Sequence, residues 1–114
     1  MYTIYFANMA KATGIEELKK RPVVVIGKNK SNGKLKVIGI TGRNRNGMST
    51  FVHMDSFKLH GYCDVSHFFE IDKKYLMDYR RACTPAEESR INKGIKMHMR
   101  NLPGDIKTAQ NREI

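Results

Sequence analysis

The residues best suited to chemistry lie on either side of a hydrophobic run near the N-terminus. Glu16 and Arg21 precede the run Val23–Gly27, and Thr41 ends the next apolar segment. If the two segments pair as an antiparallel hairpin, the start of the first and the end of the second lie at one end of the sheet. A carboxylate, a guanidinium and a hydroxyl would then meet there.

This combination of groups suits the cleavage of a phosphodiester by a neighbouring 2′-hydroxyl. A carboxylate can accept the hydroxyl proton, and a cation with a hydrogen-bond donor can stabilise the charge that builds on phosphate oxygens. The same groups also suit a loop that binds RNA phosphates and cleaves nothing. The spacing of the residues does not decide between the two.

Metal and thiol chemistry are less favoured by the sequence. His60, Cys63 and His67 are close together, but a zinc site needs four ligands, usually as two close pairs. These three run into a predicted strand, where successive side chains point to opposite faces. We therefore expect no metal and no other cofactor. Nucleophilic catalysis by Cys63 would need a histidine partner that the sequence cannot place, and no Gly-rich nucleotide-binding motif occurs.

The basic residues are concentrated in one part of the chain. The net charge is +10, from 21 Lys and Arg against 11 Asp and Glu. Residues 18–54 hold nine of the basic residues and no acidic one, whereas the rest of the chain is nearly balanced. Such a segment is expected to bind a polyanion, because each neutralised phosphate releases counterions. A merely solvated basic surface is the alternative.

Short β-prone runs separated by turn residues predict a sheet. A continuous β-branched run is typical of a strand buried on both faces, and this is expected for Val23–Gly27, with Pro22 at its first position. Asn32-Gly33 predicts a hairpin turn. The predicted strands are Tyr2–Phe6, Val23–Gly27, Leu35–Thr41, Thr50–Met54 and Cys63–Ile71. Asn8–Leu18 is predicted to be a long loop, with one helical turn around Ile15–Lys20, and Gly42–Gly47 a basic loop.

Helices are predicted after residue 72. Lys74–Arg81 is a short helix candidate. Thr84 and Glu87 match a capping box with proline at the first helical position, and apolar residues then recur every four positions. This pattern predicts a helix over Pro85–Met99.

The order of these elements favours a mainly β, α+β fold: a small curled sheet or barrel with helical covers. We expect one domain over residues 1–100 and a polar C-terminal tail over 101–114 that frays. Neither a membrane span nor a signal peptide is evident in the sequence. Two cysteines cannot form a disulfide framework, so a cytoplasmic protein is expected.

Several blocks of the sequence resemble the MazF/PemK family of toxin endoribonucleases. The blocks are Ile4-Tyr5-Phe6-Ala7-Asn8, Gly14-x-Glu16, Lys20-Arg21-Pro22-Val23-Val24-Val25-Ile26, Ile40-Thr41, Phe69-Glu70-Ile71-Asp72-Lys73 and Thr84–Ile95. They cover about residues 2–99, and the most specific is the block that runs from Gly14 to Ile26. In one departure, Lys19-Lys20 stands where the family more often has a glycine-containing dipeptide.

The resemblance implies a small SH3-like barrel with a C-terminal helix that acts as the toxin of a toxin–antitoxin system. It implies a homodimer that cleaves single-stranded RNA such as mRNA without a metal, leaving a 2′,3′-cyclic phosphate and a 5′-hydroxyl. A cognate antitoxin with an acidic, disordered tail would block it. The alternatives are a non-catalytic RNA-binding barrel and a degenerate toxin homologue that acts through protein contacts.

The resemblance also suggests roles for single residues. Arg21 matches the family's catalytic arginine, Thr41 its catalytic threonine, and Glu16 the acidic residue of the preceding loop. Because a guanidinium stays protonated, Arg21 is expected to grip the scissile phosphate, with Glu16 as the candidate base and His60 as a less favoured one. The expected RNA-binding residues are Lys19, Lys20, Arg43, Asn44 and Arg45.

Overall fold

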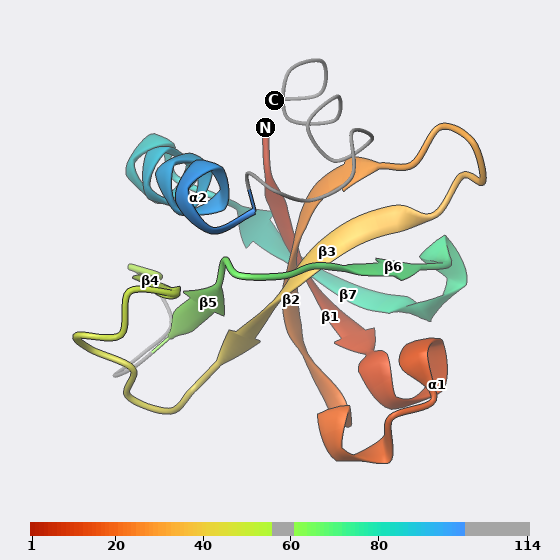
Figure 1. Ribbon diagram of the computed structural model, residues 1–114. Helices are drawn as coiled ribbons and strands as arrows, with labels where there is room; N and C mark the ends of the chain where they lie inside the picture. The colour runs from red at the N-terminus through yellow and green to blue at the C-terminus, as the bar shows by residue number, and fades with distance from the viewer. Residues whose placement is uncertain (56–60, 100–114) are drawn as a thin grey trace.

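The computed structural model describes residues 1–55 and 61–99. Over these residues, seven strands form an antiparallel sheet, accompanied by two α-helices and two short 3-10 helices (Figure 1). The elements in chain order are β1 (Thr3–Asn8), α1 (Met9–Thr13), η1 (Glu16–Leu18), β2 (Lys20–Lys28), β3 (Leu35–Thr41), β4 (Phe51–His53), β5 (Tyr62–Asp64), β6 (Phe69–Ile71), η2 (Lys73–Tyr75), β7 (Leu76–Ala82) and α2 (Pro85–His98). The predicted tail, 101–114, lies outside the described residues.

The sheet follows the strand order β4-β5-β3-β2-β1-β7, and β6 joins β3 on the same edge as β5. Leu35 at the start of β3 pairs with Ile71 of β6, and Thr41 at its end pairs with Tyr62 of β5. The single strand predicted over Cys63–Ile71 is therefore two short strands with a turn between them. The prediction of an α+β fold with a C-terminal helix is confirmed, whereas closure into a barrel stays a prediction.

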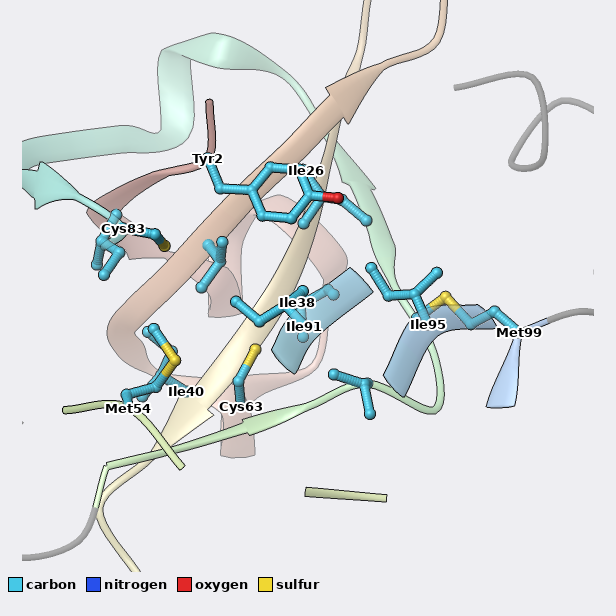
Figure 2. Packing of buried hydrophobic residues seen from close by; sticks show 13 residues of the cluster. Tyr2, Ile26, Ile38, Ile40, Met54, Cys63, Cys83, Ile91, Ile95 and Met99 are labelled. Carbon is cyan, nitrogen blue, oxygen red and sulfur yellow. The ribbon is translucent and has the colours of Figure 1, made fainter. Parts of the chain in front are cut away.

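Strand β2 is buried on both faces, as its sequence predicts. Val24 packs in one hydrophobic cluster with Ile91 and Ile95 of α2, and Val23 packs in a second cluster with Met9 of α1. Figure 2 shows the first cluster, in which side chains of the sheet and of α2 meet. Two apolar layers therefore hold β2 between the two helices.

The predicted position of Pro22 at the start of this strand is wrong. β2 begins two residues earlier, because its pairing with β1 extends to the pair Asn8–Lys20. Pro22 lies opposite Phe6 of β1, and pairing with β3 begins only at Val23. The residue without an N–H thus lies where β2 has a neighbour on one side, which is where a sheet tolerates proline.

Two more predictions from local pattern are wrong. Part of the predicted loop Asn8–Leu18 is the helix α1, which Asn8 caps by accepting a hydrogen bond from the Lys11 N–H, and which ends at Gly14 with φ +78°. The predicted helix Lys74–Arg81 is the short η2 followed by β7. β7 pairs along β1, so a long-range edge pairing overrides the local helical pattern.

Helix α2 is confirmed, and it ends one residue before the predicted Met99. Thr84 and Glu87 form the predicted capping box. The side chain of Val65, between β5 and β6, contacts the helix so closely that a Cβ atom on Gly94 would lie 2.6 Å from its Cγ2. Among the described residues, neither α-helix combines the length and the apolar character that a membrane span requires.

Candidate active site

A cavity of about 210 Å³ lies at the end of the β2–β3 hairpin, beside α1. Its polar lining comes from five side chains: Arg21, Thr41, Arg45, Asp64 and His67. Its remaining wall is apolar: Met9, Leu18, Gly39, Ile40, Phe51 and Phe69. Such a concave, mostly apolar space with a few polar groups is typical of a ligand site.

The alternation of side chains along paired strands brings Arg21 and Thr41 together. Val23 of β2 lies opposite Gly39 of β3. Residues two positions along each strand share a face, so Arg21 and Thr41 follow on the same face at the same end. Gly39 leaves open space between them, because a Cβ atom there would meet nothing within 4 Å. The hairpin geometry expected from the sequence is present.

The guanidinium of Arg21 is held in place by the short helix that precedes it. Its Nε donates to the Leu18 carbonyl at 2.5 Å, and its Nη2 to the Glu17 carbonyl at 3.4 Å. Two donor positions are thereby used for anchoring, which leaves the rest of the fork for a ligand. A charge fixed in this way needs little rearrangement when an anion binds.

The residue between η1 and β2 adopts a conformation that glycine favours. Lys19 has φ +52° and ψ −153°. Its N–H donates to the Glu16 carbonyl at 3.1 Å, and its carbonyl accepts from Ala10 at 3.0 Å. These bonds to η1 and α1 hold a strained residue two positions before Arg21 in the chain. Lys19 also belongs to the Lys19-Lys20 dipeptide, where the family that the sequence resembles more often has a glycine-containing dipeptide.

Glu16 does not line the cavity of Arg21 and Thr41. It is exposed on η1 and contributes to a separate, shallow hollow together with Lys19 and Lys20. The structure thus places Glu16 in a different hollow from Arg21 and Thr41, and its part as a base stays a prediction. Asp64 is the carboxylate that lines the cavity instead.

The three expected RNA-binding residues after β3 differ in exposure. Arg43 and Asn44 are exposed, and Arg45 is half-buried over the ring of Phe51, with 5.5 Å from Cζ to the ring centroid. The Arg43 N–H donates to the Thr41 hydroxyl oxygen at 3.2 Å, which ties the loop to the end of β3. The buried Nε of Arg45 has no hydrogen-bond partner in the described part of the chain.

Asp64 and His67 are cavity residues that the sequence analysis missed in this role. Asp64 lies at the end of β5, whose Tyr62 pairs with Thr41 of β3. Side chains two apart share a face, so this pairing carries Asp64 to the side of Thr41. The sequence drew attention to His67 only as a doubtful metal ligand. Its place in the cavity depends on the pairing of β5 with β3, and the paired residues Thr41 and Tyr62 are 21 positions apart in the chain.

The described residues show no group of three or more His, Cys, Asp or Glu that could hold a metal ion. His60 lies outside these residues. Cys63 is fully buried in the cluster under α2, and this burial raises the pKa of its thiol well above its usual value. A thiol in that setting is a poor nucleophile, because the thiolate is the reactive form.

Comparisons with known proteins show similarity at the level of structure. No protein-family model matches the chain, and no curated protein sequence matches it. Among solved structures, an endoribonuclease from Mycobacterial species in complex with its cognate antitoxin has a TM-score of 0.67 and 24% identity, over 89% of this chain and 93% of that one.

Two further toxin structures are similar. The Mycobacterium tuberculosis toxin MazF-mt6 has a TM-score of 0.68 and 17% identity, over 86% of this chain and 96% of that chain. MazF from Deinococcus radiodurans has a TM-score of 0.65 and 18% identity, over 85% and 92%. At such identities the likeness concerns the fold. The chain has the fold of the MazF endoribonuclease toxins.

Proposed function

We propose that this chain is a toxin endoribonuclease that cleaves single-stranded RNA through attack of a 2′-hydroxyl on the adjacent phosphate. The products are a 2′,3′-cyclic phosphate and a 5′-hydroxyl. The observation that carries the proposal is the shared cavity of Arg21 and Thr41, at the end of the β2–β3 hairpin, in the fold of known endoribonuclease toxins.

The cavity holds groups that match the charge of the transition state. Negative charge builds on the phosphate oxygens as the 2′-oxygen attacks, and the anchored guanidinium of Arg21 can bind two of these oxygens. The Thr41 hydroxyl can donate to one of the same oxygens or to the leaving 5′-oxygen. Arg45 adds a second positive charge at the cavity wall. These side chains supply the charge stabilisation themselves, so we propose a reaction without a metal.

The surroundings of the cavity suit a flexible single strand. Phe51 and Phe69 in its wall offer aromatic faces or edges to an unstacked base. Lys19 and Lys20 line a second hollow nearby in sequence, and Arg43 and Asn44 are exposed beyond Thr41. We propose that these residues bind the RNA backbone on both sides of the cut.

The test is to incubate the purified chain with a pool of random-sequence single-stranded RNA in EDTA and to sequence the ends. We expect cuts that leave 2′,3′-cyclic phosphates. Arg21→Ala should slow cleavage by about 10²–10³-fold, with an unchanged circular-dichroism spectrum. Lys93→Ala, on the exposed side of α2, is the control and should cleave normally. Binding without cleavage by the wild type would favour the non-catalytic RNA-binding alternative.

We also propose a homodimer that a cognate antitoxin silences. One of the similar structures is an endoribonuclease bound to its cognate antitoxin. A two-fold dimer would repeat the basic surface and lengthen the groove available to RNA. An acidic, disordered tail would compete with phosphates for that surface, and its ordering cost requires a large contact area. Light scattering, with and without the product of the adjacent gene, tests the dimer and its complex, and a monomer that cleaves RNA would contradict the dimer. An antitoxin that leaves RNA binding intact would contradict the blocking mechanism.

A further inference from the structure

We propose that His67 is the general base that takes the proton from the attacking 2′-hydroxyl, with Asp64 as the residue that positions it. This inference rests on the proposed function and adds the proton acceptor that Arg21 and Thr41 cannot provide. It assigns a role to a histidine that the sequence presented only as a doubtful metal ligand.

The imidazole of His67 is oriented by a small polar network at the end of β5. Its Nδ1 lies 3.5 Å from Asp64 Oδ2 and 3.5 Å from the Ser66 hydroxyl. Asp64 is itself fixed, because its Oδ1 accepts hydrogen bonds from the Ser66 hydroxyl at 2.6 Å and the Ser66 N–H at 2.9 Å. The edge-to-face contact with Phe69, 5.1 Å between ring centroids, restrains the ring plane.

This arrangement selects the useful tautomer of the imidazole. A carboxylate beside Nδ1 favours a proton on that nitrogen, which leaves the lone pair of Nε2 free. The contacts at Nδ1 are long for hydrogen bonds, as is common for catalytic groups before substrate binds. His67 is about half exposed, with 55% of its side chain accessible, so Nε2 can reach a bound RNA.

The other polar groups of the cavity are poorer proton acceptors. Arg21 and Arg45 carry guanidinium groups, which donate only. Thr41 carries a neutral hydroxyl. Asp64 already accepts two bonds from Ser66 and faces the imidazole with its other oxygen. Among the described residues that line the cavity, the imidazole is thus the group best suited to take a proton, because its Nε2 lone pair is not used by another contact.

The proposed step balances without any further reagent. Nε2 of His67 takes the proton of the 2′-hydroxyl while that oxygen forms a bond to phosphorus. The bond between phosphorus and the 5′-oxygen breaks, and the 5′-oxygen takes a proton from water. The imidazolium then gives its proton back to the solvent. Asp64 stabilises the imidazolium while it is charged.

The experiment compares His67→Ala and His67→Gln with the wild type on the random-sequence RNA in EDTA. We expect kcat to fall by about 10²–10⁴-fold, whereas binding of an uncleavable 2′-O-methyl RNA should change less than about twofold. Added imidazole should restore part of the His67→Ala activity and none of the Arg21→Ala activity. The fall in wild-type rate on the acidic side should disappear in both variants, a change that a structural role would not produce.

His53 provides a matched control. Its Nδ1 lies 3.8 Å from Asp55, and its side chain is 49% exposed, much like that of His67, but it does not line the cavity. His53→Ala should cleave at the wild-type rate. Wild-type rates for His67→Ala would overturn the role of His67, as would lost activity that imidazole cannot restore. If the wild type itself does not cut RNA, the proposed endoribonuclease function is wrong. That outcome is distinct from an active wild type with an equally active His67→Ala variant, which contradicts only the role of His67.

Discussion

At the scale of single residues, the cavity pairs a charged group with a neutral one. The Arg21 guanidinium is anchored on two carbonyls, and the Thr41 hydroxyl accepts a bond from the Arg43 N–H. A neutral hydrogen bond is weaker than a charge-assisted one, about 1 kcal/mol against two to three times that amount. Thr41→Ala should therefore slow RNA cleavage by about fivefold, well short of the loss in Arg21→Ala.

Single-turnover rates on one fixed RNA substrate measure this difference. Thr41→Ser keeps the hydroxyl and serves as the control, with a rate close to that of the wild type. If Thr41→Ala were as slow as Arg21→Ala, the hydroxyl would have a larger part in the reaction than hydrogen bonding explains.

At the scale of the elements, one buried carboxylate joins α2 to the sheet. Glu87 accepts hydrogen bonds from the Arg81 guanidinium at 2.7 and 2.8 Å, and from the backbone N–H groups of Thr84 and Asp55 at 2.8 Å each. The bond from Arg81 is the main reason that the pKa of Glu87 is lowered to about 2. In an unfolded chain, a glutamate titrates at about 4.3.

This difference predicts how the stability of the fold depends on pH. Because the folded pKa is the lower one, the ionised carboxylate stabilises the fold above about pH 4.3, by about 3 kcal/mol, and this contribution is lost as the pH falls toward 2. The Glu87→Gln protein should be less stable than the wild type at neutral pH. Its free energy of unfolding should also fall less than that of the wild type when the pH is lowered. Urea unfolding at several pH values measures this, with the exposed Asp78→Asn as the control. Parallel pH curves for Glu87→Gln and the wild type would contradict the assignment.

The packing of α2 against the β5–β6 segment gives a second prediction at this scale. Alanine is the better helix former by about 1 kcal/mol, yet a Cβ atom on Gly94 would lie 2.6 Å from Val65 Cγ2. Since overpacking costs about 1–3 kcal/mol, Gly94→Ala should destabilise the protein overall. Urea unfolding measures the change, and Ser89→Ala, on the exposed side of the same helix, should be neutral or stabilising.

The contact itself can be isolated with a double mutant. Val65→Ala makes room beside the helix, so Gly94→Ala should cost less in that background than in the wild type. Equal costs in both backgrounds would show that the helix backbone, and not Val65, sets the preference for glycine at this position.

At the scale of the whole molecule, the charge of residues 18–54 should control RNA binding. Neutralising about four phosphates of a single strand predicts a slope near −3 in a plot of log affinity against log salt concentration. Charge reversal at Arg43 should flatten the slope by about 0.7, and reversal at Arg45 by as much again. Fluorescence anisotropy with 2′-O-methyl RNA measures this without cleavage. Lys93→Glu is the control, and an unchanged slope in all variants would make the basic segment a solubility feature.

Local signals in the sequence determined a large part of this protein. The β-branched run of β2 and the Asn-Gly turn specify a hairpin, and the pleat of paired strands then places Arg21 beside Thr41. The capping box specifies where α2 begins. These features depend on residues that are near each other in the chain, so they can be predicted from the sequence alone.

The rest was decided by the tertiary structure. Leu76–Ala82 is a strand because the free edge of β1 pairs with it, although its local pattern resembles a helix. Asp64 and His67 line the cavity because β5 pairs with the end of β3, whereas Glu16 of η1 lies in a different hollow with Lys19 and Lys20. Such pairings join segments that are far apart along the chain. The stabilisation by these pairings comes from contacts between distant segments, which a local sequence pattern cannot predict. It is larger than the intrinsic preference of each segment for helix or strand.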